Sequence, residues 1–207
     1  MIVALFILLS ISFAAEWNGI YSSDPSAPVI SLEDISGSST IIKISLDGYY
    51  SNDINIANNI FTKISANGGT SILKEGFPDL PQFSTSLIIP DESNMSIKII
   101  NQEYIDIEGI EIIPSKGNLS RSVNPSDVDY IFSGAYEKDL FYPGTLAYLR
   151  DPYILRNHRG QTVMFNPFQY NPQSKILRVY TSLTIEVYED GTSLQNIKQR
   201  KSSQFKE

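Results

Sequence analysis

The sequence predicts an all-β protein, an antiparallel β-sandwich of jelly-roll type with few or no helices. Short runs rich in Ile, Val, Thr and aromatic residues recur along the chain, and Gly, Pro, Asn and Asp separate them. The clearest period of two lies between Val179 and Val187, where every second residue belongs to one face of a strand. No long amphipathic helical pattern intervenes, so the strands must pair with one another, which favours an antiparallel sandwich.

The first strand is expected in residues 39–48, where an Ile-rich run ends at Asp47-Gly48. Residues 53–69 indicate a hairpin joined at Asn58-Asn59, because Asn tolerates the left-handed conformation of a tight turn. A helix is the alternative here, since several apolar residues of this run have roughly helical spacing. The Asn pair and the lack of strong helix formers favour the hairpin.

The remaining strands and the domain limits follow from the same pattern. Further strands are expected in residues 83–91, 95–115, 160–168 and 174–191. Residues rich in Ser, Pro, Gly and Asp precede the first strand, and a basic stretch without apolar periodicity follows the last one. We therefore divide the chain into a signal peptide (1–14), a loose lead-in (15–38), the β-sandwich (39–190) and a basic tail or linker (191–207).

The amino terminus has the features of an export signal. An apolar run from Ile2 to Leu9 is followed by Ser12 and Ala14, which fit the small residues preferred by signal peptidase, so cleavage is expected after Ala14. No Lys or Arg precedes the run, and a buried first strand or a misassigned start codon remain alternatives. The run is shorter than the roughly 20 apolar residues of a membrane span. We expect a secreted or cell-surface protein with no stable membrane span after cleavage.

Charge and composition exclude several classes of function. The net charge of −7 disfavours nucleic acid as a partner, and the absence of Cys excludes disulfides and thiolate metal sites. The single histidine, His158, lies between two arginines and is interpreted as a turn residue rather than a catalytic one. Asp127 and Asp129 offer oxygen ligands but lack the glycine and distal glutamate of a calcium loop. We expect neither a metal nor a cofactor.

Aromatic residues are abundant and clustered. The chain has 12 Tyr, 10 Phe and one Trp, and many of them lie in residues 130–157 and 165–172. A strip of exposed rings would stack on sugars and make the domain a cell-surface carbohydrate-binding or adhesion module. The other interpretation is that these rings fill the core and corners of the sandwich.

A set of motifs resembles the amino-terminal prodomain of gingipain-type cysteine proteases, which are secreted bacterial peptidases of clan CD. The similar segments are 74–90, 112–117, 141–144, 149–172 and 175–189. Two elements are specific in combination: Gly-x-Pro-x-Leu-Pro at 76–81 and Phe-Gln-Tyr-Asn-Pro at 168–172. The resemblance covers about residues 40 to 190 and implies an antiparallel β-sandwich.

The resemblance also implies a function. Prodomains of this type keep their protease latent by covering its active-site cleft, and a basic residue shortly after Pro-Ser-Lys-Gly enters the specificity pocket. The residue in register here is Arg121, flanked by Ser120 and Ser122, and Lys116 within the motif is the other basic candidate. The implied partner is the catalytic domain of a gingipain-type cysteine protease, whose folding the prodomain could also assist.

The resemblance further implies that this chain is not an enzyme. Gingipain-type proteases carry their catalytic His and Cys in a following domain, and the sequence ends at Glu207 without one. In a zymogen the basic tail would contain the junction, so Arg200 and Lys201 are the predicted processing residues.

Overall fold

The computed structural model describes residues 15–36 and 39–198 and confirms the predicted fold class. The described chain contains antiparallel β-sheets and two short 3-10 helices, and it contains no α-helix. The 3-10 helices are η1 (Pro125–Asp127) and η2 (Gly134–Glu137). Among the described residues no helix has the length and apolar character needed to cross a membrane.

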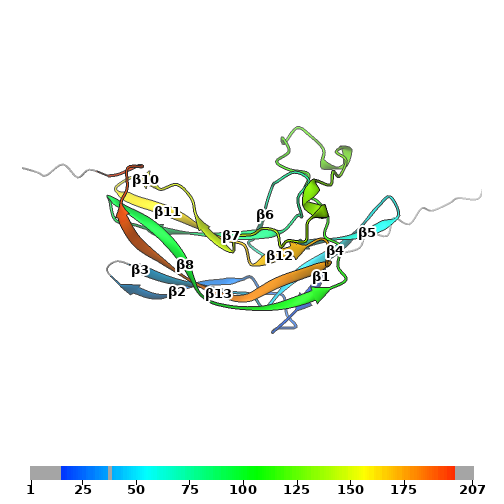
Figure 1. Cartoon of the computed structure of the whole chain (residues 1–207), viewed down its shortest axis with the longest axis horizontal. Coiled ribbons are helices and arrows are strands. Elements are labelled where there is room, and N and C mark those ends of the chain that lie inside the picture. Colours follow the sequence, from blue (N-terminus) through cyan, green and yellow to red (C-terminus); the bar gives the residue numbers. More distant parts are fainter. Residues whose placement is uncertain (1–14, 37–38, 199–207) are drawn as a thin grey trace, which may run out of the picture.

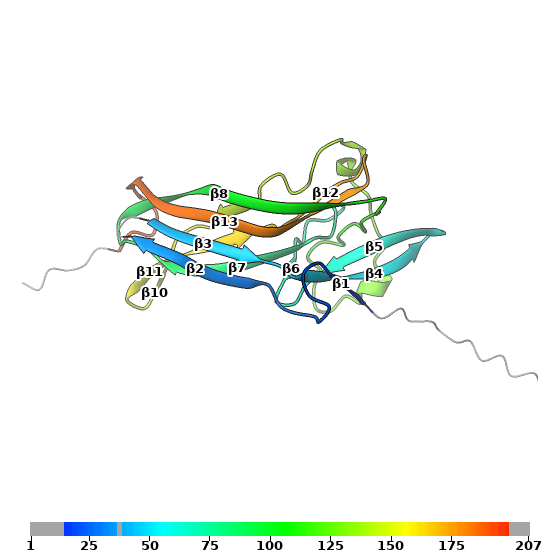
Figure 2. The same cartoon turned by 90° about the horizontal axis from the view of Figure 1, so that it is seen from below.

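The largest layer is organised around one long central strand, β13, which pairs with β8 on one side and with β3 and β12 on the other. β2 continues the sheet beyond β3 (Figures 1 and 2). The strands are β2 (Val29–Ser36), β3 (Ser39–Ser45), β8 (Ser93–Glu108), β12 (Phe168–Asn171) and β13 (Ile176–Thr192). Register shifts interrupt the β8–β13 ladder, and such bulges bend the ribbon, whose curvature is visible in Figure 1.

A second sheet packs over this layer, and a third, smaller sheet extends it. The second sheet has the order β10-β11-β7-β6, with β9 also paired to β11, and the third has the order β1-β4-β5. The second sheet contains β6 (Thr70–Ser71), β7 (Pro81–Ile88), β9 (Ala147–Leu149), β10 (Tyr153–Leu155) and β11 (His158–Phe165). The third contains β1 (Glu16–Gly19), β4 (Gly48–Ile56) and β5 (Asn59–Ser65).

The hydrophobic core lies between the two large sheets. Ile42 and Ile44 of β3 and Leu183 of β13 are fully buried in one cluster with Val163 and Phe165 of β11. The predicted alternation along β13 is confirmed except around the bulge between Tyr180 and Ser182, where consecutive residues are all buried. Burying apolar side chains at about 25 cal/mol per Å² drives the two sheets together.

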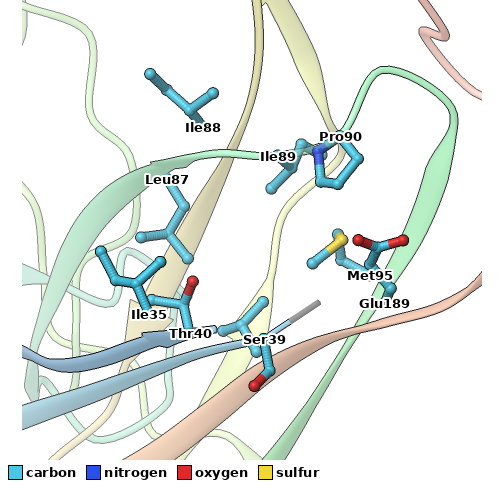
Figure 3. A pocket seen from close by; sticks show the side chains of 10 residues that line it. Ile35, Ser39, Thr40, Leu87, Ile88, Ile89, Pro90, Met95 and Glu189 are labelled. Carbon is cyan, nitrogen blue, oxygen red and sulfur yellow. The ribbon is translucent and has the colours of Figure 1, made fainter. Parts of the chain in front are cut away.

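The sheets separate at one end, where an apolar cavity of about 320 Å³ opens between them. Ile35 from β2, Leu87 from β7 and Met95 from β8 line it, and Figure 3 shows Leu87 pointing toward Thr40 while Ile88 points away. This end carries the start of β3 and the end of β7, and it lies at the opposite end of the molecule from the loops around η1 (Figures 1 and 2).

The hairpin expected in residues 53–69 is confirmed, and the helical alternative is wrong. β4 and β5 pair with Ile56 opposite Asn59, so the turn residues are Ala57 and Asn58, one position earlier than predicted. Both have positive φ, and the side chain of Asn55 accepts a hydrogen bond from the Asn58 amide at 3.0 Å. This turn has the left-handed geometry that matches the twist of the strands.

The loose lead-in expected over residues 15–38 is wrong, because β1 and β2 lie within it. Trp17 of β1 packs edge-on against Tyr50 at 5.1 Å, and its indole N–H donates to the Ser22 carbonyl at 3.1 Å. The Ser- and Asp-rich composition concealed both strands. β1 is stabilised by pairing with the distant β4, whereas β2 forms a hairpin with the adjacent β3, in which Ser36 pairs with Ser39.

The carboxyl-terminal boundary also needs correction. β13 extends to Thr192, and residues 193–198 continue as a segment that is hydrogen-bonded to the sandwich rather than as a free tail. The predicted processing residues Ala14, Arg200 and Lys201 lie outside the described residues.

Candidate functional site

The candidate inhibitory segment, which we call the Arg121 loop (residues 116–128), rises from a rigid base. Residues 112–115 are buried, and their main chain bonds to two neighbouring segments. The Ile113 amide donates to the Thr62 carbonyl of β5 at 3.1 Å, and the Ser115 amide donates to the Phe77 carbonyl at 2.7 Å. The loop therefore leaves the sandwich from a strip held on both sides.

Arg121 occupies the tip of a tight turn. The Val123 amide donates to the Ser120 carbonyl at 3.0 Å, which places Arg121 and Ser122 at the two central positions. The hydroxyls of Ser120 and Ser122 are 3.0 Å apart and hydrogen-bonded to each other. The Arg121 side chain is exposed, and within the described part of the chain it makes no hydrogen bond or ion pair. Its charge is therefore available to a partner.

Lys116 fastens the two ends of the loop together. Its Nζ donates to the Pro125 carbonyl at 2.6 Å and lies 4.0 Å from the centroid of the Tyr130 ring. The Asn124 side chain accepts from the Ser126 amide at 3.2 Å and caps η1, which begins at Pro125. Lys116 thus lies inside the loop's own contacts, whereas Arg121 lies outside them.

The Gly-x-Pro-x-Leu-Pro element builds part of the loop's base. Gly76 has φ +76°, and a Cβ there would lie 3.0 Å from the Ser133 Cβ, so both backbone conformation and space require glycine. Its amide donates to the Ser115 carbonyl at 2.9 Å, directly before the loop. Leu80 is fully buried in the core. This element therefore connects the core to the loop.

Asp79 of the same element is a buried carboxylate beneath the loop. The residue is 8% exposed, its Oδ2 lies 3.9 Å from the Lys63 Nζ, and its Oδ1 has no hydrogen-bond partner among the described residues. Burial raises the pKa of Asp79, and a hydrogen bond from Ser71 and the charge of Lys63 oppose that rise. Asp79, Lys116 and Tyr130 all line one polar cavity of about 350 Å³.

The Phe-Gln-Tyr-Asn-Pro element holds the main chain at Pro143 and Ile110 through its polar side chains. Gln169 donates to the Pro143 carbonyl at 2.6 Å and accepts from the Tyr180 hydroxyl at 2.8 Å. The Tyr170 hydroxyl donates to the Ile110 carbonyl at 3.1 Å, and burial raises the pKa of Tyr170 to about 12. These side chains hold the chain at Pro143 and at Ile110, which precedes the buried residues 112–115, and they do not form an exposed site.

The clustered aromatic rings between residues 130 and 172 are buried or half-buried except for the exposed Phe132. Phe165, Phe168 and Tyr170 are buried. Tyr136 donates its hydroxyl to the Ile112 carbonyl at 2.9 Å and packs on Phe132 at 4.9 Å between ring centroids. Tyr136 thus supports the base of the Arg121 loop, and the three buried rings serve the core rather than a sugar-binding strip.

The other candidate residues stand apart from the loop's base. His158 is exposed and is the first residue of β11, paired with Leu155 of β10, so it borders the β10–β11 turn rather than lying within it. Asp127 lies in η1 and Asp129 follows it, both exposed. Residues 15–36 and 39–198 contain no group of three or more His, Asp or Glu side chains that could hold a metal ion.

Comparison with known proteins identifies the family. The Propeptide_C25 family model matches residues 18–205, which is most of the chain. The chain belongs to this propeptide family. It is therefore a prodomain, since the matched family is one of propeptides.

Individual relatives agree with this assignment to the Propeptide_C25 family. The chain is 32% identical over 190 residues to gingipain R2 of Porphyromonas gingivalis, a match that covers 90% of this chain and 26% of that protein. It is 38% identical over 135 residues to gingipain R1, covering 65% of this chain and 14% of that protein. The chain thus spans about a quarter or less of these relatives.

Solved structures show the same fold. A complex of the Porphyromonas gingivalis RgpB pro- and mature domains matches with a TM-score of 0.78 and 32% identity, covering 81% of this chain and 87% of that chain. A structure addressing the zymogenic latency of gingipain K from the same organism matches with a TM-score of 0.71 and 17% identity, covering 86% of this chain and 100% of that chain. The second likeness is one of fold alone.

Proposed function

We propose that this prodomain keeps a gingipain-type cysteine protease latent by placing the Arg121 loop in its active-site cleft. The observation that carries the proposal is the isolation of the Arg121 guanidinium at the tip of a turn whose base is anchored on both sides. The matched complex of RgpB pro- and mature domains supports a catalytic domain as the partner.

The physical basis of the proposal is mimicry of an arginine substrate. A guanidinium forms bidentate, charge-assisted hydrogen bonds with a carboxylate in a specificity pocket. The contacts of Lys116 and the Ser120–Ser122 pair limit the conformations that the loop loses on binding. The same restraint holds the peptide bond after Arg121 away from the geometry needed for nucleophilic attack.

Export and assistance in folding belong to the same proposal. The apolar run ending at Ala14 and the membership in a family with the gingipains support secretion or display at the cell surface. A prodomain that binds the native cleft but not the unfolded chain stabilises the folded protease by mass action.

The direct test is inhibition in trans. The purified prodomain, without residues 1–14, is titrated into a mature Arg-specific gingipain, and hydrolysis of an arginine peptide substrate is followed. Tight inhibition that is competitive with the substrate is expected. Inhibition that is absent, or that substrate does not relieve, would contradict occupation of the cleft.

A further inference from the structure

The largest polar side chain buried in the described structure, Arg159 of β11, lies far from the Arg121 loop. The residue is 1% exposed, and no ion pair joins its guanidinium to a carboxylate of the described residues, although the charge of Asp91 acts on it. It lies at the β10–β11 end of the molecule, at the other end of the long axis from η1 (Figure 1). A charge buried in this way needs a full set of hydrogen-bond acceptors.

Main-chain carbonyls from two separate segments supply those acceptors. Nη1 donates to the carbonyl of Pro90 at 2.8 Å, in the connection between β7 and β8, and to the carbonyl of Ser93 at 2.7 Å, at the start of β8. Nε donates to the Asn196 carbonyl at 2.9 Å, and Nη2 donates to the Gln195 carbonyl at 3.0 Å. The guanidinium therefore joins the chain that follows β13 to the chain that precedes β8.

The segment that follows β13, residues 193–198, makes further contacts that agree with this arrangement. The Ser193 amide donates to the Glu92 carbonyl at 2.7 Å, and the Lys198 amide donates to the Asp91 carbonyl at 3.0 Å. The Asn196 side chain donates to the Pro152 carbonyl at 2.6 Å, and the Lys198 ammonium donates to the Asn157 carbonyl. This C-terminal segment is thus held at both ends and at its centre.

We propose that Arg159 is a positioning residue that clamps residues 193–198 onto the sandwich and thereby restricts proteolytic processing to sites beyond Lys198. If the segment leaves, Nε and Nη2 of the buried guanidinium lose their acceptors, so local opening at Lys198 is opposed by an unpaired buried charge. A protease needs an extended, detached chain on both sides of the bond that it hydrolyses. Lys198 is protected by these contacts, and the predicted processing residues Arg200 and Lys201 follow it in the sequence.

The clamp does not depend on the inhibitory role of Arg121, and trypsin tests it without any cognate protease. In the parent prodomain, the earliest carboxyl-terminal cuts are expected after Arg200 and Lys201, each adding one water across the peptide bond. Mass spectrometry separates these products from the one ending at Lys198. The Arg159→Lys variant keeps the charge but cannot reach all four carbonyls, so cleavage after Lys198 is expected to accelerate by about 10- to 100-fold.

Two further variants control the experiment. Arg156→Gln removes an exposed arginine from the neighbouring turn and is expected to give the parent pattern. Asn196→Ala loosens the C-terminal segment without touching the core and is expected to accelerate the Lys198 cut by roughly 2- to 10-fold. If the Arg159→Lys variant is not folded under the digestion conditions, the rate of cleavage after Lys198 in the Asn196→Ala variant decides the result.

Three results would overturn the proposal. One is a parent protein cut after Lys198 as quickly as after Arg200 and Lys201. Another is a folded Arg159→Lys variant with the same Lys198 rate as Arg156→Gln. The third applies if Arg159→Lys does not fold, and is an Asn196→Ala variant with the parent rate.

Discussion

Replacement of Arg121 by alanine is expected to weaken inhibition of an Arg-specific gingipain severely and to leave folding nearly unchanged. In the free prodomain the Arg121 side chain is exposed and forms no bond within the described residues, so its removal leaves no group of this chain unpaired. An exposed loop substitution changes stability by less than about 0.5 kcal/mol, which is about 1–2 °C in Tm for a domain of this size.

In the complex the same substitution leaves the carboxylate that the guanidinium would contact without a hydrogen-bond partner. Loss of one partner from a buried charged pair costs about 2–5 kcal/mol, which corresponds to roughly 30- to several-thousand-fold in the inhibition constant. Arg121→Lys is expected to be intermediate, because a single ammonium cannot make the two parallel bonds of a guanidinium.

The assay compares inhibition constants and melting temperatures of the parent, Arg121→Ala, Arg121→Lys and the control Arg156→Ala. The control removes an equal charge from an exposed turn at the other end of the molecule and is expected to inhibit like the parent. Equal constants for Arg121→Ala and the parent would refute the role of Arg121, and attention would move to a wider contact surface.

Three other predictions concern the support of the loop. Lys116→Met is expected to weaken inhibition about 10-fold with little change in Tm, because it removes the hydrogen bond to Pro125 that restrains the loop. An unchanged inhibition constant would refute this role of Lys116. Gly76→Ala is expected to destabilise the prodomain by about 1–3 kcal/mol because of its positive φ, and urea unfolding would measure the loss. Burial raises the pKa of Asp79, so the folded state binds more protons than the unfolded state between the two pKa values. The free energy of unfolding therefore falls as pH rises from about 4 through the folded pKa of Asp79. Asp79→Asn is therefore expected to gain stability relative to the parent between pH 4 and pH 8, and a pH-independent difference in urea unfolding would contradict this.

Local patterns predicted the strands well and failed where distant segments decide the structure. The alternation from Val179 to Val187 and the Asn-rich turn were sufficient for β13 and for the β4–β5 hairpin, because each depends on neighbouring residues. β1 was missed because its stability comes from pairing with β4 and from Trp17 packing on Tyr50, and neither leaves a local signal in a Ser- and Asp-rich stretch.

The site shows the same division. Resemblance of sequence located Arg121, but the role of Lys116 as a brace depends on carbonyl and ring positions that only the folded chain brings together. No local pattern indicates that Arg159 is buried, because its four acceptors come from residues 36 to 69 positions away in the sequence. Two arginines three residues apart in one hairpin thus have opposite environments, with Arg156 exposed and Arg159 buried.

The proposed inhibitory loop and the proposed clamp occupy different parts of the molecule. The Arg121 loop rises near η1, whereas the C-terminal segment is clamped beside β10 and β11 at the opposite end of the long axis (Figures 1 and 2). Hydrolysis beyond Lys198 would therefore leave every described contact of the Arg121 loop in place. On this arrangement, cutting the junction does not by itself release a protease held by Arg121, because the loop's anchors at Gly76, Ser115 and Lys116 share no hydrogen bond with the clamp. Release would require a second event at the loop itself, such as cleavage within residues 116–128 or dissociation of the prodomain.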